Sequence, residues 1–243
     1  MSSKDLQTVI RAAKAGGKVV RGYFGKTLTI TEKTIAADFK TEADVGSEKA
    51  ILAILEKAFP TYNIFSEECG FIDKKSEYTF YIDPLDGTNN FALGIPNFSV
   101  SIALVRGEET VLGVVHLPMI DLTYSALKGE GAYCNGNKLK ASSETLQEKS
   151  TFAGVYGYHY PKKQLNGMID LLNQKAKRLL ISWSGASDLC LVSSGKIEVV
   201  VVNNIELHDF LAGKLIAKEG GCVITDLKGK PEKNDLNKDF LVG

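Results

Sequence analysis

Short strand-like runs from residue 62 onward are the feature that most restricts the folds open to this chain. They are rich in β-branched and aromatic residues, and several end in glycine, proline or charged turns. The segment 121–139 continues the pattern, with Asn135-Gly136 as a strong turn signal. The clearest runs read NIF, TFYI, SVSIALV and TVLGVVHL. Such runs predict sheets and exclude a fold built from helices alone.

Helical segments flank and interrupt these runs. An apolar stripe at Leu6, Val9, Ile10 and Ala13 predicts a helix over 4–24. A second helix is predicted over 43–59, ended by Pro60, and the alternating stretch 27–44 between them predicts a hairpin or an extended loop. After residue 145 the chain alternates between strands at 151–156, 178–182, 197–202 and 222–226 and helices near 162–175, 185–194 and 208–219.

This order of elements predicts layered α and β structure. No linker and no repeat separates the halves, so we expect a single unit of two lobes that share an interface. The first lobe, 1–145, would carry the functional loop, and the second, 146–243, would close the site.

Composition narrows the class of protein. With 243 residues, 44% of them hydrophobic, the chain can build a large core. Its 29 basic and 29 acidic residues balance, which disfavours binding to nucleic-acid polymers or membrane surfaces. Apolar runs such as VVVV at 199–202 are too short to span a bilayer. The absence of a secretory signal and the four scattered cysteines predict a cytoplasmic protein with buried thiols.

The stretch YIDPLDGTNNF, residues 81–91, places two carboxylates around a proline. Pro84 restricts Asp83 to an extended conformation, so we expect the strand to end and bend before Asp86 if both acids are to converge. Converging carboxylates repel each other unless a cation neutralises them, and Mg²⁺ prefers such hard oxygen ligands.

The residues that follow favour a phosphate site. Gly87 permits close approach of the backbone, and Thr88 or Asn89 can cap a helix whose free N–H groups attract anions. Metal-binding acids followed by such a turn indicate phosphoryl transfer. Taken alone, the segment could equally be an ordinary acidic turn, because all its residue types favour turns.

Three further stretches carry acids near predicted strand or helix ends: DFKTEAD with Asp44, FSEECG with Glu67, and LHDFLAGKLIAKEGG with Asp209. Together with YIDPLDGTNNF, ALKGEGAYCNGNKL and SGAS, they resemble the inositol monophosphatase family, in family order over roughly residues 30–226. This is a family of magnesium-dependent, lithium-sensitive phosphatases related to fructose-1,6-bisphosphatases and bisphosphate nucleotidases. The resemblance implies a five-layer αβαβα sandwich, a small phosphate monoester as substrate and a homodimer.

The resemblance also implies roles for individual residues in a metal-assisted hydrolysis without a covalent intermediate. Two or three Mg²⁺ ions would be held, with Li⁺ as an inhibitor, by Glu67, Asp83, Asp86, Asp209 and the carbonyl of Leu85. The catalytic residues would be Asp44, Thr88 and Glu67, with Thr88 and Asp44 positioning and deprotonating the attacking water. Substrate-binding residues would be Asp86, Gly87, Thr88, Asn89, Gly185, Ala186 and Asp209. Lys33 would belong to a loop near the site.

Some positions depart from the family pattern and leave the substrate open. Val202 stands where inositol-specific members often carry a glutamate, and His208, expected to be packed or solvated, stands where a tryptophan is common. At Gly185 and Ala186 the family's usual hydroxyl is missing, and the chain stops where a terminal helix would follow. Inositol 1-phosphate, fructose 1,6-bisphosphate, a nucleotide 3′-phosphate and histidinol phosphate all remain candidates.

Two rival interpretations are weaker. Haloacid-dehalogenase phosphatases use Asp-x-Asp-Gly-Thr with a nucleophilic first aspartate, whereas here the two acids are one residue further apart. A catalytically inactive sensor would be expected to have lost one of the acids or the water-positioning pair, and all of them are present.

Overall fold

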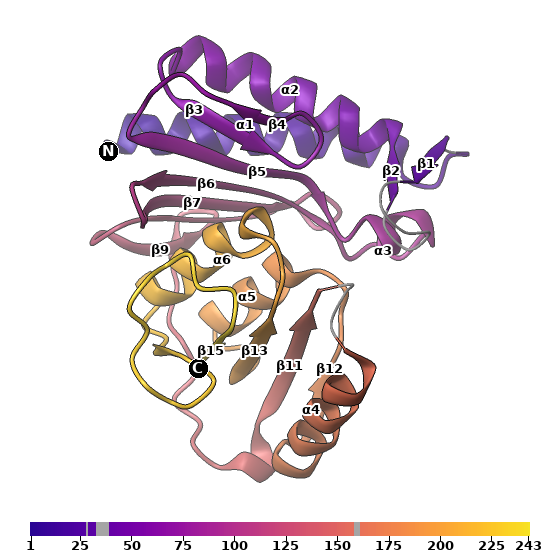
Figure 1. Ribbon diagram of the computed structural model, residues 1–243, viewed down its shortest axis with the longest axis vertical. Coiled ribbons are helices and arrows are strands. Elements are labelled where there is room, and N and C mark those ends of the chain that lie inside the picture. Colours follow the sequence, from indigo (N-terminus) through magenta and orange to yellow (C-terminus); the bar gives the residue numbers. More distant parts are fainter. Residues whose placement is uncertain (28, 33–38, 158–160) are drawn as a thin grey trace.

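The computed structural model describes residues 1–27, 29–32, 39–157 and 161–243. Five layers of helix and sheet stack on one another (Figure 1). Helices α1 (Ser3–Tyr23) and α2 (Glu42–Ala58) cover the outer face of a large sheet. Helices α5 (Gly185–Ser193) and α6 (Leu207–Glu219) lie between this sheet and a smaller one, and α4 (Lys162–Lys175) covers the far side. The predicted αβαβα sandwich is therefore confirmed.

The large sheet is mostly antiparallel, with β3 and β5 as its parallel pair. In spatial order its eight strands are β10 (Asn137–Lys138), β9 (Gly131–Cys134), β8 (Leu122–Leu127), β7 (Glu109–Leu117), β6 (Ser99–Arg106), β5 (Tyr78–Asp86), β3 (Asn63–Ser66) and β4 (Gly70–Ile72). In the described chain a separate antiparallel pair joins β1 (Ile30–Glu32) to β2 (Phe39–Thr41), in agreement with the hairpin alternative for this stretch.

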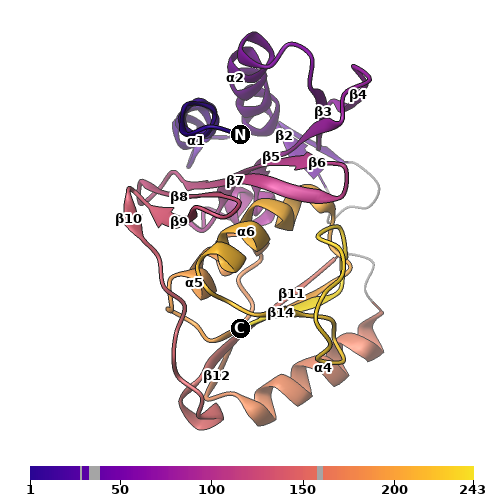
Figure 2. The same cartoon turned by 90° about the vertical axis from the view of Figure 1, so that its left-hand side faces the viewer.

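The smaller sheet combines parallel and antiparallel strands. Its order is β12 (Arg178–Leu180), β11 (Thr151–Tyr156), β13 (Val199–Asn203), β15 (Phe240–Val242) and β14 (Ile224–Thr225). A short helix α3 (Thr88–Ala92) follows β5, and a 3₁₀ turn spans Gln147–Lys149. Figure 2 shows the two sheets edge-on with α5 and α6 between them. The division into lobes 1–145 and 146–243 stays a prediction, because α6 from the second half packs directly on β7 of the first.

Local signals explain where the first two helices begin. The Ser2 hydroxyl accepts a hydrogen bond from the Asp5 N–H, and the Asp5 carboxylate accepts one from the Ser2 N–H. Thr41 and Asp44 form the same reciprocal capping box at the start of α2. Such boxes satisfy backbone donors that the first helical turn leaves unpaired. The second box also fixes the position of a predicted catalytic residue.

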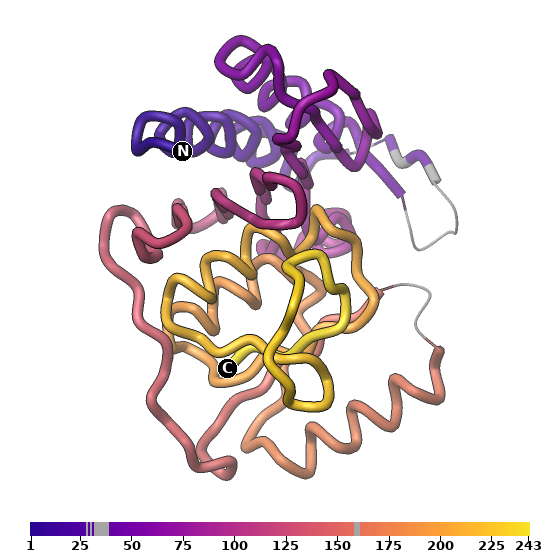
Figure 3. Tube along the Cα trace, turned by 60° about the vertical axis from the view of Figure 1, so that its left-hand side comes forward, coloured from indigo at the N-terminus to yellow at the C-terminus, as the bar shows by residue number. Residues whose placement is uncertain are grey.

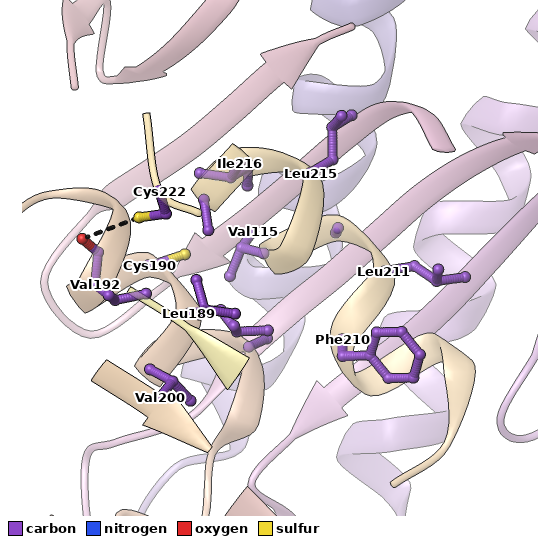
Figure 4. Close-up of a cluster of buried hydrophobic side chains, with 14 of the residues drawn as sticks. Val115, Leu189, Cys190, Val192, Val200, Phe210, Leu211, Leu215, Ile216 and Cys222 are labelled. Atoms are coloured by element: carbon purple, nitrogen blue, oxygen red, sulfur yellow. Dashed lines mark hydrogen bonds between the residues drawn. The ribbon is translucent and has the colours of Figure 1, made fainter. Parts of the chain in front are cut away.

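One apolar cluster joins the two sheets through α5 and α6 (Figure 4). Val115 of β7, Val200 of β13 and Phe210 of α6 are all fully buried in it. Gly113 of β7 lets α6 approach closely, since a Cβ there would lie 2.7 Å from the Ala212 carbonyl oxygen. The burial of apolar surface on both faces of the helix layer holds the two sheets in a fixed relation.

The cysteines are free, but only some follow the expectation of burial. Cys190 and Cys222 are buried in this cluster, and the Cys222 Sγ lies 3.7 Å from the Val192 carbonyl oxygen. Cys134 is half-buried. Cys69 is exposed, so the prediction is wrong there; it occupies the turn between β3 and β4, where the Cys69 N–H donates to Glu48.

The chain after α6 folds back beside that helix, as the yellow segment in Figure 3 shows. Lys214 of α6 is almost fully buried, and its Nζ donates to the Glu232 carboxylate at 2.6 Å and to the Asp235 carbonyl at 2.9 Å. The ammonium group also lies 4.0 Å from the centre of the Phe240 ring. Within the described ranges, no helix combines the length and apolar character that crossing a membrane requires.

Candidate active site

The two acids of the DPLD stretch are brought together by a bulge in strand β5. Asp83 pairs with Ser101 and Asp86 pairs with Ser99, so two residues on β5 oppose one residue on β6. The prediction that the strand ends between them is therefore wrong, because β5 continues to Asp86. A bulge tolerates proline, which cannot donate to the ladder, and it re-aims side chains that a regular strand would alternate.

Gly87 makes the turn from β5 into α3. Its φ of 91° lies in the left-handed region, and a Cβ there would lie 3.1 Å from the Asn97 carbonyl oxygen. Glycine is thus required for both conformation and space. Gly87 itself is the N-cap of α3, which corrects the expectation that Thr88 or Asn89 caps this helix; both lie within its first turn, and α3 has only five residues.

Most of the predicted site residues line one cavity of about 410 Å³ between the two halves of the chain. From the predicted set, the lining includes Glu67, Asp83, Leu85, Asp86, Gly87, Thr88, Gly185 and Asp209. The described residues Asp44, Asn89 and Ala186 are not part of it. Lys33 lies outside the described residues.

Asp44 lies directly behind Thr88. The Thr88 hydroxyl is 3.3 Å from Oδ1 of Asp44 and 3.0 Å from the carbonyl oxygen of Leu85. The other carboxylate oxygen of Asp44 accepts hydrogen bonds from the backbone and side chain of Thr41. Burial raises the pKa of Asp44 to about 7, although these bonds from Thr41 oppose the shift. The geometry places a fully buried carboxyl group within reach of a hydroxyl at the cavity wall.

The acids at the cavity floor interact with one another. Burial raises the pKa of Asp83 well above its ordinary value, and the charges of Glu67, Asp86 and Asp209 raise it further. Burial also raises the pKa values of Asp86 and Asp209. The charge of His208 lowers the pKa of Asp209 and so offsets part of its rise. Carboxylates that disfavour one another's ionised form provide a strong attraction for a cation.

Asp86 is held by hydrogen bonds from both halves of the chain. Its Oδ2 accepts hydrogen bonds from the hydroxyls of Ser184 at 2.6 Å and Ser99 at 2.9 Å, and from the Ala186 N–H at 3.2 Å. Ser184 and Ala186 belong to the second half of the chain, so Asp86 joins the halves at the site. Sequence reasoning missed Ser99 and Ser184 as partners of Asp86. Gly185 and Ala186 carry no hydroxyl, and that of Ser184 donates to Asp86, so the missing hydroxyl contact to the substrate stays a prediction.

Known proteins resemble this chain over nearly its whole length. The model of the inositol monophosphatase family matches residues 2–243. A fructose-1,6-bisphosphatase/inositol-1-monophosphatase of Aquifex aeolicus is 37% identical, with 94% of this chain and 87% of that protein covered. The Nus factor SuhB of Pasteurella multocida is 35% identical, covering 92% and 85%. This chain belongs to the inositol monophosphatase family.

Solved structures of the family agree with the fold. An inositol monophosphatase of Thermotoga maritima superimposes with a TM-score of 0.89 at 32% identity, covering 99% of this chain and 92% of the other. The extragenic suppressor protein SuhB of Bartonella henselae gives 0.93 at 28% identity, covering 99% and 94%. Members of the inositol monophosphatase family are phosphatases and in general depend on Mg²⁺, so the chain is assigned to the phosphoric monoester hydrolases.

Two departures from the family pattern are placed by the structure. Val202 is fully buried in β13, so its side chain packs in the core and does not line the cavity. His208 is buried as expected of a packed histidine; its ring stacks near Phe65, with centroids 6.0 Å apart, and its Nε2 lies 3.2 Å from Oδ1 of Asp209. His208 also contributes to the cavity wall.

The carboxylates that line the cavity are the kind of ligand that Mg²⁺ prefers, and the inositol monophosphatase family in general depends on Mg²⁺. Within the described ranges, no group of three or more His, Cys, Asp or Glu side chains is already drawn together closely enough to bind a metal ion. Glu67, Asp83, Asp86 and Asp209 nevertheless line one cavity. Burial raises the pKa values of the three aspartates, and the charges of neighbouring acids raise those of Asp83 and Asp209 further. Oxygen ligands of this kind suit a hard divalent cation, which would offset the repulsion between them.

Proposed function

We propose that this chain is a Mg²⁺-dependent phosphomonoesterase that hydrolyses a small sugar or polyol phosphate of the inositol 1-phosphate type, without a covalent intermediate. The observation that supports this most strongly is the shared cavity, in which Asp83, Asp86 and Asp209 adjoin the Gly87-Thr88 turn. A cation held by the acids and a phosphate held by the turn would then be neighbours.

The proposed metal ligands are the carboxylates of Glu67, Asp83, Asp86 and Asp209 and the carbonyl oxygen of Leu85. Two or three Mg²⁺ ions would be accommodated, and Li⁺ would inhibit. When bound, Mg²⁺ supplies charge stabilisation for the phosphoryl oxygens and makes water a better nucleophile near neutral pH. The N–H groups of Gly87, Thr88 and Asn89 would donate to the phosphate oxygens. Asp86 and Asp209, with the turn at Gly185 and Ala186, would position the rest of the ester.

Thr88 and Asp44 are proposed to handle the proton of the attacking water. A hydroxyl can accept a hydrogen bond from the water while donating its own proton to a carboxylate. The 3.3 Å separation between Thr88 Oγ1 and Asp44 Oδ1 suits this arrangement. Asp44 would then accept the proton, with Glu67 contributing from the cavity wall.

The alternative substrates carry two phosphates: fructose 1,6-bisphosphate or a 3′(2′),5′-bisphosphate nucleotide. Relatives named fructose-1,6-bisphosphatase/inositol-1-monophosphatase keep the first of these open. A second phosphate is commonly bound by lysine or arginine. The cavity lining contains neither among the described residues, which favours a monophosphate.

A substrate panel tests this proposal. Phosphate release from inositol 1-phosphate, fructose 1,6-bisphosphate and adenosine 3′,5′-bisphosphate would be measured with Mg²⁺, with excess EDTA and with added Li⁺. We expect Mg²⁺-dependent, Li⁺-inhibited hydrolysis, with the highest kcat/KM for the monophosphate. Hydrolysis that persists in EDTA, or trapping of an aspartyl-phosphate, would contradict the proposal. The homodimer and the cytoplasmic location stay predictions, the first of which light scattering would check.

A further inference from the structure

Trp183 is an unusual residue in the wall of the cavity. It is the single tryptophan of the chain, and the residue is 53% exposed while it lines the cavity. Its φ of 59° lies in the left-handed region, which is unfavourable for a residue with a large side chain. A large apolar side chain left open in a cavity, on a strained backbone, indicates a contact for a ligand.

Hydrogen bonds on both sides of Trp183 hold this backbone in place. The carbonyl oxygen of Ser182 accepts from the side-chain amides of Asn90 at 2.7 Å and Asn97 at 3.2 Å. On the other side, the Ser184 hydroxyl donates to Asp86. The carbonyl oxygen of Trp183 itself lies 3.3 Å from where a Cβ on Gly87 would stand. The indole is therefore attached to a backbone fixed against the phosphate-binding turn.

An aromatic ring contacts the indole, and aliphatic side chains line the same cavity. The ring of Tyr156 meets it edge to face, with centroids 5.8 Å apart and planes at 66°. Val155, Ile181 and Ile205 line the same cavity from the second half of the chain. The acids of the proposed metal site occupy the opposite, first half, apart from Asp209. The second half also contributes the polar Asn204 and Glu206 to the lining. The cavity thus has an acidic side for the metal and phosphate and, around Trp183 and Tyr156, an aromatic and aliphatic wall for the alcohol that leaves.

We propose that Trp183 is a specificity-determining residue, which binds the apolar face of a ring in the leaving group. The preferred substrates would then be monophosphates of alcohols that carry such a ring, close enough to the phosphate to reach the indole. This inference rests on the proposed phosphatase function and narrows its substrate class. Stacking on an indole is favourable because the ring combines a large apolar area with an oriented quadrupole.

Two esters that differ only at the end of the alcohol test this assignment. In 2-phenylethyl phosphate a phenyl ring occupies the place that a hydroxyl takes in 2-hydroxyethyl phosphate. We expect the wild-type protein to show the higher kcat/KM for the phenyl ester. Replacement Trp183→Asn should lower the ratio of the two kcat/KM values about ten-fold, as the loss of one aromatic contact and its buried area predicts. Asparagine tolerates positive φ, so the backbone should be retained.

Two further variants separate binding from folding. Trp183→Phe keeps an aromatic face and should restore most of the ratio. Phe71 of β4 is exposed to a similar degree, 56%, and is not among the described residues lining the cavity, so Phe71→Asn should leave the ratio unchanged. Equal melting temperatures for the Trp183 variants and the wild type would show that the fold is intact.

Fluorescence supplies a readout that does not depend on turnover. Because Trp183 is the only tryptophan, its emission should shift to shorter wavelength when 2-phenylethanol is added with Mg²⁺ and inorganic phosphate. Ethylene glycol should give no shift beyond that of phosphate alone. An unchanged kcat/KM ratio in Trp183→Asn, or no emission shift with the phenyl alcohol, would overturn the assignment. Failure of the wild-type protein to hydrolyse any ester would instead overturn the proposed function.

Discussion

The hydroxyl of Ser184 lies 2.6 Å from Oδ2 of Asp86 and links the α5 turn to the end of strand β5. Ser184 is 1% exposed, and its oxygen also lies 2.7 Å from the hydroxyl of Ser187. A carboxylate held from both halves of the chain is fixed in orientation before any ligand binds. When a carboxylate binds a metal ion, loss of such a supporting hydrogen bond commonly lowers metal affinity or activity about 10–100-fold.

We therefore expect Ser184→Ala to weaken Mg²⁺ activation by about ten-fold or more, through a less well-oriented Asp86. The measurement is the Mg²⁺ concentration that gives half-maximal phosphate release. Ser193→Ala is a matched control, because Ser193 is equally buried in α5 but its hydroxyl donates to the Cys190 carbonyl. A similar loss of Mg²⁺ activation in both variants would mean that Ser184 acts only through the packing of α5.

The Thr88–Asp44 pair should behave as one unit in catalysis. Thr88→Val removes the hydroxyl, and Asp44→Asn replaces the carboxylate while the amide oxygen can still serve the capping box with Thr41. Each change should lower kcat about 100-fold or more, as loss of general base catalysis predicts. The double variant should lose little beyond either single change, because both break the same proton path. Losses that multiply in the double variant would show that the two residues act independently.

Asp188 of α5 should make the stability of the protein depend on pH. Its carboxyl group is buried, and neither oxygen has a hydrogen-bond partner within the described chain. Burial raises its pKa to about 7, with Ser182 nearby opposing the shift and the charge of Asp86 adding to it. Because the folded pKa lies above the unfolded value, the stability from protonated Asp188 is full below pH 3.8 and is lost as the pH rises to about 7.

Asparagine at position 188 stays neutral, so Asp188→Asn should stabilise the protein increasingly over that range. Between pH 5 and pH 8 the gain in the free energy of unfolding should grow by about 2 kcal/mol. Urea unfolding at both pH values measures this. The same substitution at the exposed Asp170 of α4 should give no such trend. A gain for Asp188→Asn that is the same at pH 5 and pH 8 would contradict the expected ionisation.

The buried ion pair between Lys214 and Glu232 should be costly to break. Their side chains are 2% and 8% exposed. Within the described chain, Glu232→Ala would leave the ammonium group of Lys214 with backbone carbonyls as its hydrogen-bond partners and no carboxylate bonded to it. We expect a loss of about 3 kcal/mol in the free energy of unfolding, because a buried charge loses its counter-ion. Glu77→Ala, in an exposed pair with Arg106, should change stability very little. Equal losses in the free energy of unfolding for Glu232→Ala and Glu77→Ala, measured by urea unfolding, would contradict the expectation that breaking the buried pair costs more.

The sequence predicted the elements well where periodicity is strong. Strand β11 and helix α4 have the predicted bounds. Helices α1 and α2 differ from theirs by one residue at each end, and α6 by one residue at its start. Their signals are local, because an apolar stripe, a capping box or a proline acts within a few residues. Strand β4 was missed, since its three residues are stabilised by pairing with β3 rather than by their own pattern.

The parts of the site that were missed depend on contacts between distant segments. Ser184 opens the SGAS stretch, but no local signal indicates the roles of Ser184 or Trp183, because these roles come from Asp86, Asn90 and Gly87 in the other half of the chain. The bulge in β5 was mistaken for the end of the strand for a related reason. Proline and glycine indicate an interruption, but pairing with Ser99 and Ser101 decides that the strand resumes.

Calorimetric titration of Mg²⁺ into the purified protein tests the central idea most directly, because it measures cation binding apart from turnover. We expect saturable Mg²⁺ binding by the wild-type protein, tightened by inorganic phosphate and abolished in Asp83→Asn and Asp209→Asn variants that remain folded by circular dichroism. Wild-type protein that binds no Mg²⁺, or folded variants that bind it as tightly as the wild type, would contradict the account.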